Sequence, residues 1–454
     1  MKLRGPADGR VLTALDEDSP AEVRAKAAAA RRGQARWAAV PLARRKAALA
    51  RFAALVAEDR ELLAAVLTRE TGKPLSQSLG ELNALGGRLR FFLDHAAAAL
   101  RIERVRDAGG TFEEISHEPL GVVANISAWN YPWFVGTNVF VPALLMGNAV
   151  LYKPSEHAAL TGLAIALLLW KAGVPRDAFI PVIGAGKTGA ALLEADVDAV
   201  FFTGSHATGL RVAAAAARRL IKVQLELGGK DPAYAAADAA PAKAGAALAE
   251  GAFYNNGQSC CAVERIYVHA RIYDRFIAAF LAAVKGYALG DPMDKGTFLG
   301  PLAREEQLTV LAAQVKDARR KGARLLLGGG RLARPGYWFA PTVLDRCDHS
   351  MSVMREESFG PVIGIMKVSS DEEAVRLMND TEYGLTAAVY SKSRERARRI
   401  LSRVDSGSAY WNCCDRVSPY LPWSGRRHSG LGLTLSKAGI TAFLRPKAWH
   451  LRPG

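Results

Sequence analysis

Apolar residues in the first quarter of the chain recur every three or four positions, the spacing that places them on one face of an α-helix. The pattern covers residues 21–98, where Ala, Leu and Arg predominate. Pro41 and the segment Gly72-Lys73-Pro74 interrupt it, because proline cannot continue a helix. This part of the chain therefore predicts several successive helices.

The pattern changes at residue 111. Residues 111–120 alternate like a half-exposed strand, and residues 121–126 form a short apolar run like a buried one. Further strand-like runs, separated by helical stretches, lie at residues 149–152, 179–183, 199–202 and 222–225. This alternation predicts an α/β fold with an open, doubly wound, mostly parallel sheet.

A second α/β segment begins after about Gly228. Its expected strands lie at residues 266–268, 324–327, 362–366 and 387–390. A chain of 454 residues is too long for one compact core. We therefore expect two or three domains.

The net charge of +16 raises the question of nucleic-acid binding. The basic residues are scattered over separate helices and loops, as in Arg31-Arg32, Arg218-Arg219 and Arg426-Arg427. The chain has no basic tail and no alternation of aromatic and basic residues. We expect a solvated basic surface and no nucleic-acid partner.

Five cysteines bear on compartment and metal binding: Cys260, Cys261, Cys347, Cys413 and Cys414. Two adjacent pairs and a single residue suit neither a disulfide framework nor a Cys-x-x-Cys metal site. The first residues lack the apolar core of a signal peptide. The longest apolar stretch, about 158–170, is shorter than the roughly 20 residues that cross a bilayer. We therefore expect reduced thiols in the cytoplasm, no bound metal and no membrane association.

Two segments carry candidate chemistry. Cys260 follows the polar sequence NNGQS, and a helix starting there would favour the thiolate through the helix dipole. Glu226 precedes Gly228-Gly229, which would allow a tight turn or close approach of a ligand. The ordinary alternatives are a buried structural cysteine and an ion-paired carboxylate. A thiol that attacks carbon and a carboxylate that activates water are the groups that an acyl-transfer cycle requires.

Other candidates follow predicted strands, where doubly wound proteins bind ligands. They are the amide of Asn130 within WNYPW (129–133), Lys153 and Glu156 within KPSE (153–156), and FTGS (202–205), which would open a helix suited to an anion. Each has an ordinary alternative as a turn or a helix cap.

The order and spacing of these segments resemble the NAD(P)-dependent aldehyde dehydrogenase superfamily over nearly the whole chain. The matching segments are TGKP (71–74), WN (129–130), KPSE (153–156), FTGS (202–205), ELGGK (226–230), GQSC (257–260), ESFGP (357–361) and, more loosely, PWSG (422–425) with SG (429–430).

The resemblance implies how the chain is divided. Residues 1–100 and 119–226 would form a dinucleotide-binding domain, and residues 227–408 the catalytic domain. Residues 101–118 and 430–454 would be oligomerisation segments. Relatives exchange strands between subunits through such segments, so we expect a homodimer or homotetramer.

The resemblance also implies a reaction. Cys260 would form a thiohemiacetal with an aldehyde, and Asn130 and the Cys260 backbone N–H would hold its oxyanion. After hydride transfer to NAD, Glu226 would activate the water that hydrolyses the thioester to the acid.

The implied cofactor residues are Lys153 and Glu156 for the adenosine ribose, Gly204 and Ser205 for the pyrophosphate, and Glu357 for the nicotinamide ribose, with Phe359 beside it. Glu156 would repel the 2′-phosphate of NADP, which favours NAD. Lys153 keeps NADP as an alternative cofactor.

Departures from the family pattern bear on the substrate. Val139 replaces a lysine of many relatives, and Asn138 stands where relatives specific for succinate semialdehyde tend to carry arginine. Four aromatic residues would line the substrate pocket: Trp129, Tyr131, Trp133 and Trp423. We expect an apolar or aromatic aldehyde as substrate, with succinate semialdehyde or another semialdehyde as the alternative.

Two other classes remain open. A catalytically silent binding protein would fit the basic charge, although Cys260, Glu226 and Asn130 are all present. A redox or thioesterase-type cysteine enzyme would need a histidine base, and none of the eight histidines lies in a comparable motif.

Overall fold

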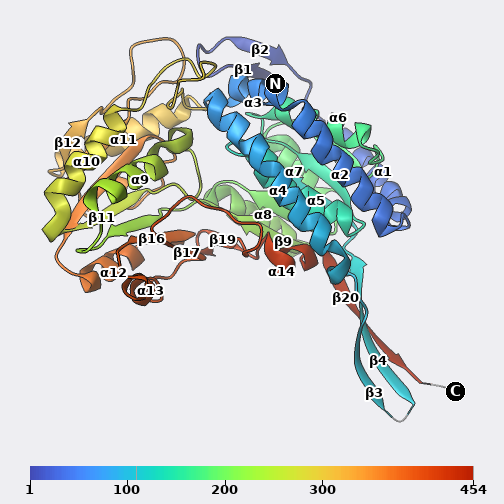
Figure 1. Cartoon of the computed structure of the whole chain (residues 1–454). Helices are drawn as coiled ribbons and strands as arrows, with labels where there is room; N and C mark the ends of the chain where they lie inside the picture. Colours follow the sequence, from blue (N-terminus) through green and yellow to red (C-terminus); the bar gives the residue numbers. More distant parts are fainter. Residues whose placement is uncertain (109, 453–454) are drawn as a thin grey trace.

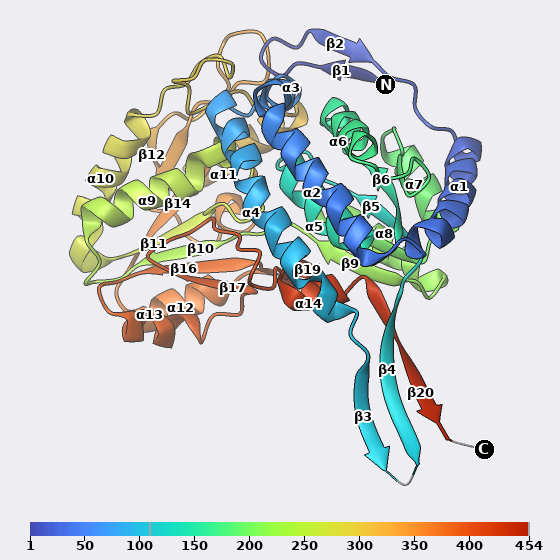
Figure 2. The same ribbon diagram turned by 45° about the vertical axis from the view of Figure 1, so that its right-hand side comes forward.

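The computed structural model describes residues 1–108 and 110–452. Two lobes, each built on a mainly parallel sheet, lie side by side, and a narrow arm of three strands projects from them (Figures 1 and 2). The predicted α/β fold with a doubly wound sheet is confirmed.

The first lobe contains a six-stranded sheet in the order β19-β9-β8-β5-β6-β7. Its strands are parallel except β19, which pairs antiparallel with β9 at one edge. The strands are β5 (Val122–Ile126), β6 (Ala149–Lys153), β7 (Phe179–Pro181), β8 (Ala199–Thr203), β9 (Lys222–Glu226) and β19 (Gly430–Leu431).

Helices cover both faces of this sheet. One face is covered by α1 (Pro20–Ala38), α7 (Gly186–Glu194) and α8 (His206–Arg218). The other is covered by α2 (Leu42–Glu58), α5 (Pro132–Leu145) and α6 (Ala159–Lys171), with α3 (Arg60–Thr71) and α4 (Leu75–Ala99) packed outside them. The breaks expected at Pro41 and at residues 72–74 are confirmed.

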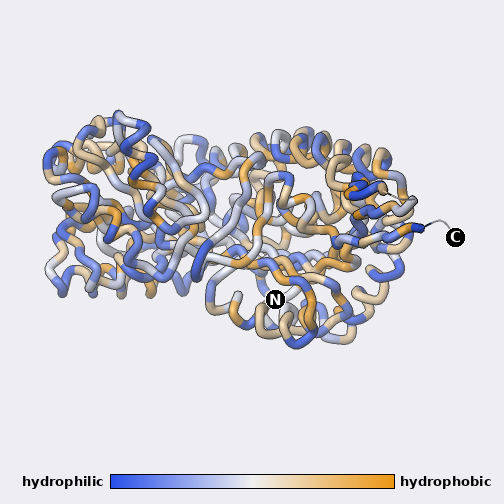
Figure 3. Tube along the Cα trace, turned by 90° about the horizontal axis from the view of Figure 1, so that it is seen from below, coloured by the Kyte–Doolittle hydropathy of each residue, from blue (hydrophilic) through white to orange (hydrophobic). Residues whose placement is uncertain are grey.

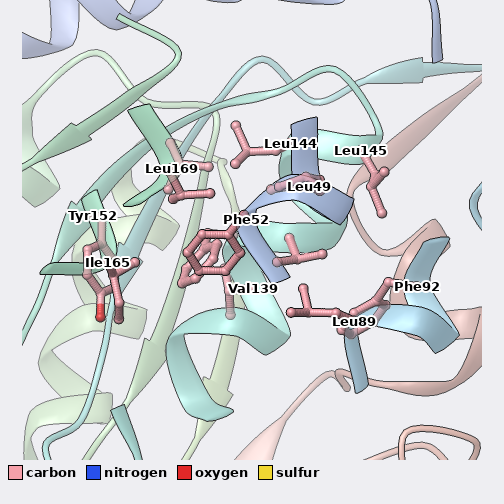
Figure 4. Close-up of a cluster of buried hydrophobic side chains, with 14 of the residues drawn as sticks. Leu49, Phe52, Leu89, Phe92, Val139, Leu144, Leu145, Tyr152, Ile165 and Leu169 are labelled. Atoms are coloured by element: carbon pink, nitrogen blue, oxygen red, sulfur yellow. The ribbon is translucent and has the colours of Figure 1, made fainter. Parts of the chain in front are cut away.

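The main apolar core lies between this sheet and helices α2, α4, α5 and α6 (Figure 4). Aromatic rings meet edge to face in it, as Phe52 and Phe140 do at 6.1 Å. Val139 belongs to the same cluster and is 2% exposed. Val139, which departs from the pattern of the resemblance, is thus part of the apolar core.

The second lobe contains a seven-stranded sheet in the order β12-β13-β14-β11-β10-β16-β17, parallel except for β12 at its edge. Its strands are β10 (Pro232–Ala235), β11 (Arg265–His269), β12 (Arg324–Leu327), β13 (Thr342–Asp345), β14 (Val362–Val368), β16 (Thr386–Tyr390) and β17 (Ser408–Trp411). Helices α9 (Pro241–Phe253) and α10 (Tyr273–Lys285) share one core. Helices α11 (Glu306–Arg320), α12 (Asp371–Asn379) and α13 (Arg394–Leu401) share the other.

The arm is an antiparallel sheet of β3 (Glu103–Ala108), β4 (Thr111–Pro119) and β20 (Leu444–Leu451). The expected segment 430–454 is longer than the part that enters this arm. Residues 430–431 join the first sheet as β19, and Ile440 and Phe443 lie in its core. Residues 430–443 thus pack on the first lobe, while residues 109 and 453–454 lie outside the described part of the chain.

Short elements complete the description. They are β1 (Lys2–Arg4), β2 (Val11–Ala14), β15 (Tyr383–Gly384), β18 (Arg426–Arg427), α14 (Ser436–Thr441) and three 3₁₀ turns, η1 (Tyr254–Gly257), η2 (Ala270–Ile272) and η3 (Ser352–Met354).

Hydrophilic and hydrophobic residues alternate along the trace of both lobes (Figure 3), as expected for helices and strands with one buried face. Within the described residues, no helix is both long enough and apolar enough to span a membrane.

Candidate active site

The sheet of the first lobe brings four of the predicted site segments together. Lys153 and Glu226 end β6 and β9, Ser205 follows β8, and Asn130 follows β5. These four strands are neighbours in the order β9-β8-β5-β6 and run parallel. Parallel strands have their carboxyl ends at one edge, so residues from distant parts of the sequence share that edge.

Cys260 lies in the loop between α9 and β11 and is half-buried. The expectation of a helix beginning at this cysteine is wrong, because residues 258–264 form a turn that leads into β11. The loop bends sharply at Asn255 and Asn256, whose φ angles are 52° and 55°. Asparagine enters this left-handed region more readily than most residues.

Asn130 is tied to the loop that carries Cys260. Its side-chain amide donates to the carbonyl of Gln258 at 3.2 Å, and its own carbonyl accepts from the Asn255 amide at 3.2 Å. A primary amide has two N–H groups, and this bond uses one of them. The other can serve an oxyanion that develops on a group attached to Cys260.

Cys261 is buried beside the nucleophile candidate. Its thiol donates to Oδ1 of Asp415 at 2.9 Å, and Ser259 donates to the same oxygen at 3.2 Å. The contact with Cys260 and burial raise the pKa of Cys261 well above its usual value. Cys261 is therefore held as a neutral thiol that anchors the loop.

Cys260, Asn130 and Glu226 line one cavity of about 960 Å³. The same cavity is lined by several other predicted residues: Gly204, Ser205, Glu357, Phe359, Trp129, Tyr131 and Trp423. Lys153 and Glu156 do not line it, although they lie on the same edge of the sheet. The residues expected for catalysis and most of those expected for the cofactor thus share one space.

Glu226 is buried within this cavity wall, with 7% of its surface exposed. Its Oε1 accepts hydrogen bonds from the Thr434 hydroxyl and from the Gln224 amide, the latter at 3.3 Å. Burial raises the pKa of Glu226 to about 7, against the opposing effect of these bonds and of the positive charge of Arg88. A carboxylate with this pKa can accept a proton near neutral pH.

Gly228 and Gly229 bring the Glu226 segment close to its neighbours. A Cβ at Gly228 would lie 2.2 Å from Oε1 of Glu357, and one at Gly229 would lie 2.8 Å from the carbonyl oxygen of Cys260. Any side chain at these positions would push the Glu357 loop or the Cys260 loop away. The two glycines therefore let three functional segments meet.

A buried ion pair, missed in the sequence, holds the Glu357 loop in place. Lys230 contacts Glu264 at 2.7 Å, and Glu264 accepts from the backbone N–H groups of Ser358 and Phe359 at 2.8 and 2.9 Å. Burial and the charge of Glu264 raise the pKa of Glu357 to about 8. The feature of the sequence that could have pointed to Lys230 is its position directly after the two glycines.

Two groups on the sheet edge suit a dinucleotide. Helix α8 begins after Ser205, so its free N–H groups are available to an anion such as a pyrophosphate. The Lys153 ammonium lies 3.9 Å from Oε2 of Glu156. Burial would raise the pKa of Glu156, but the charge of Lys153 leaves it below its usual value, so it is an anion at neutral pH.

The four aromatic residues expected in the substrate pocket separate in the structure. Trp129 contacts the Phe359 ring at 5.5 Å, on the side of the predicted cofactor residues. Tyr131 stacks with Phe134 at 6.1 Å, and Trp423 is 5% exposed in the cavity wall. Trp133 was assigned wrongly: it is fully buried in the core of the first lobe and does not line the cavity.

Helix α4 contributes charged residues that the sequence did not reveal. Glu81 pairs with Lys73 at 2.6 Å and accepts from the backbone N–H of Trp133 at 2.9 Å. It thereby holds the start of α5 at Pro132, two residues after Asn130. Arg88, about two helical turns further along the same face, donates to Oδ1 of Asn138 at 2.6 Å and lines the cavity.

The model of the aldehyde dehydrogenase family matches residues 1–449. The chain belongs to the aldehyde dehydrogenase family. Members oxidise aldehydes with NAD or NADP, which sets the reaction class of this enzyme. Its mainly parallel sheets and the cavity at their edges are consistent with this membership.

Solved structures, one of them named an aldehyde dehydrogenase, share the whole fold. PnpE in complex with nicotinamide adenine dinucleotide is 33% identical with a TM-score of 0.97, and the match covers 100% of this chain and 94% of that one. An NAD-dependent aldehyde dehydrogenase from Sinorhizobium meliloti is 33% identical with a TM-score of 0.96, covering 100% and 92%. An NADP-dependent enzyme from E. coli is 31% identical with a TM-score of 0.96, covering 100% and 94%.

Within the described residues, no three His, Cys, Asp or Glu side chains are arranged to hold a metal ion, and all five cysteines are free.

Proposed function

We propose that this aldehyde dehydrogenase oxidises its aldehyde to the carboxylic acid with NAD, through an acyl group carried on Cys260 and released by water. The observation that carries the proposal is that Cys260, Asn130 and Glu226 line a single cavity with Ser205 and Glu357. The proposed nucleophile, oxyanion donor, base and cofactor site thereby lie in one cavity.

The residues present fit NAD. The N-terminus of α8 offers N–H groups for the pyrophosphate. The Glu357 carboxylate lies directly against Gly228, in space that a side chain at position 228 would occupy. Lys153 and Glu156 would hold the adenosine ribose, and the Glu156 carboxylate disfavours a 2′-phosphate. When bound, NAD supplies the acceptor for the hydride. NADP is the alternative cofactor, because Lys153 offers a cation beside Glu156.

The chain's own groups carry the remaining chemistry. The Cys260 thiolate adds to the aldehyde carbon, and the second N–H of Asn130 donates to the resulting oxyanion. Loss of hydride from that carbon leaves a thioester on Cys260. Glu226 then removes a proton from a water molecule as the water attacks the thioester, which releases the acid and restores the thiolate.

The cavity walls indicate an aldehyde with an apolar or aromatic body. Tyr131, Phe134, Tyr420 and Trp423 all line the cavity. Planar side chains of this kind bury flat apolar groups effectively.

We also propose that the arm joins subunits into a homodimer or homotetramer. Strands β3 and β20 form its two edges, and several large apolar side chains on it or directly before β3 are exposed: Ile102, Val105, Trp449 and Leu451. Open strand edges with apolar side chains are suited to pairing with another chain.

The test is oxidation of an aldehyde panel by purified protein, followed by NADH absorbance, with Cys260→Ala and Cys347→Ala variants. Cys347 is buried in the second lobe and does not line the cavity. We expect Cys260→Ala to abolish turnover and Cys347→Ala to retain it. Peptide mass spectrometry of the enzyme trapped with aldehyde and NAD should find the acyl group on Cys260. Turnover by Cys260→Ala, or binding without turnover by the wild type, would contradict the proposal.

A further inference from the structure

Arg88 is a buried cation without an anionic partner. It is 5% exposed, and its one hydrogen bond goes to the neutral amide oxygen of Asn138 at 2.6 Å. Among the described residues no carboxylate lies within ion-pair distance of it. The charges of Glu226 and Glu81 act on it only from further away, and Glu81 is itself paired with Lys73. Burying a charge is costly unless it is paired. A group supplied from outside the chain would complete this site.

The position of the guanidinium leaves its donors available. The Arg88 group stacks over the Phe134 ring at 4.3 Å, which supports it without using its N–H groups. A guanidinium has five N–H donors, of which Asn138 accepts from one. Within the described residues, the Arg88 nitrogens that have no hydrogen-bond partner are not fully buried. Because Arg88 lines the cavity, we take these N–H groups to be accessible from it.

Arg88 remains charged under working conditions. Burial lowers the pKa of its guanidinium to about 10, and the negative charges of Glu226 and Glu81 oppose that change. The group is therefore protonated at neutral pH. A planar, fixed cation with free paired N–H groups is suited to binding a carboxylate at two points.

We infer that Arg88 binds a carboxylate at the end of the substrate remote from the aldehyde, so that the preferred substrates are aldehyde acids with an apolar or aromatic body. This inference rests on the proposed function, because it places the substrate's aldehyde carbon at Cys260 in the same cavity. Phe134, which lines the cavity beneath the guanidinium, would contact the body of the substrate.

The test compares two probes of the same shape, para-formylbenzoate and the uncharged para-formylbenzamide. Wild type, Arg88→Gln, Arg88→Lys and Arg90→Gln are assayed for kcat/KM with each. Arg90 lies on the same helix but is exposed, so its variant controls for a charge change on α4. Arg88→Lys keeps a cation at the site if Arg88→Gln fails to fold.

We expect the wild type to prefer the acid probe. Arg88→Gln should lower kcat/KM for that probe by roughly tenfold to a hundredfold, the effect of losing charge-assisted hydrogen bonds, with little change for the amide. For the acid probe, kcat/KM of Arg88→Lys should lie between those of the wild type and Arg88→Gln, and Arg90→Gln should match the wild type. No preference in the wild type, or an equal loss for both probes, would overturn the inference; equal loss would mean that Arg88 acts on Glu226 instead.

Binding without catalysis separates this inference from the proposed function. Terephthalate, the dicarboxylate product of the acid probe, is titrated into each protein by calorimetry. Binding that Arg88→Gln weakens supports the carboxylate site even if neither aldehyde is oxidised, in which case only the proposed reaction fails. Equal binding by wild type and Arg88→Gln would overturn the site.

Discussion

Thr434 donates its hydroxyl proton to Oε1 of Glu226, and its backbone pairs with Trp423 on the wall of the active-site cavity. The residue that holds the base is thus also joined to an aromatic residue that borders the substrate. A hydrogen bond of this kind favours the ionised carboxylate and keeps its pKa from rising further.

Replacing Thr434 by valine removes that bond and should raise the pKa of Glu226 above its present value of about 7. Because the base must be ionised, the acid limb of the pH profile for hydrolysis should move to higher pH by about one pH unit. The profile of kcat, measured where hydrolysis limits turnover, checks this. Thr441→Val is the control, since the exposed Thr441 hydroxyl bonds only the Ala438 carbonyl. An unmoved limb in Thr434→Val would show that Glu226 does not limit the rate.

Glu226→Gln keeps the size of the side chain but cannot accept the proton. Acylation of Cys260 should still release NADH, so rapid mixing should show a burst close to the enzyme concentration. The steady rate that follows should fall by roughly a hundredfold or more, the usual contribution of a general base. An unchanged steady rate, or loss of the burst with the steady rate, would contradict the assignment of Glu226 to hydrolysis.

The sequence predicted Cys260, Glu226 and Asn130, because the chemistry of each is visible in its local motif. The parallel topology of the first sheet then explained why Asn130 and Glu226 lie at one edge. Trp133 could not be separated from Tyr131 in the same way, because only the packing of α5 decides which aromatic ring faces the core.

Arg88 and Thr434 could not be predicted from motifs at all. Arg88 is one of many arginines on helices, yet it follows Glu81 and Leu85 on the buried stripe of α4, and a charge on an apolar stripe is a signal. The argument against carboxylate-bearing aldehydes considered Asn138 alone. The fold places Arg88 against it from another helix.

Cofactor choice should depend on Glu156. Glu156→Gln removes the negative charge that opposes a 2′-phosphate, so kcat/KM with NADP should rise relative to NAD by about tenfold, equal to about 1.4 kcal/mol. Lys153 beside it should then help to bind the phosphate. Initial rates with both cofactors check the ratio, and the exposed Glu194→Gln on α7 serves as control. A ratio that does not change would place the adenosine ribose elsewhere.

The Lys230–Glu264 pair should matter for stability and for the cofactor together. Lys230→Met leaves the buried Glu264 without its cation, which costs about 3–5 kcal/mol. The Tm should fall, and KM for NAD should rise because the Glu357 loop loses its anchor. The milder Ser358→Ala removes one hydrogen bond to Lys230, worth about 1 kcal/mol, and should keep the fold.

Calorimetry and NAD titration measure these two effects. Lys285→Met, at the exposed end of α10, is the matched control. A Tm unchanged in Lys230→Met would mean that the pair contributes no net stability, and an unchanged KM would separate it from the cofactor site.

The arm offers the clearest test of assembly, because its apolar residues are far from the cavity. Ile102 and Val105 are 62% and 58% exposed on the edge strand β3 and its approach. If subunits pair through this arm, the double change Ile102→Glu, Val105→Glu should place charges in the interface and shift the particle to a smaller oligomer or a monomer.

Light scattering after size-exclusion chromatography measures the mass. Leu220→Glu adds a charge at a residue 94% exposed after α8 and should leave the mass unchanged. A double variant with the wild-type mass would show that the subunits associate through another surface.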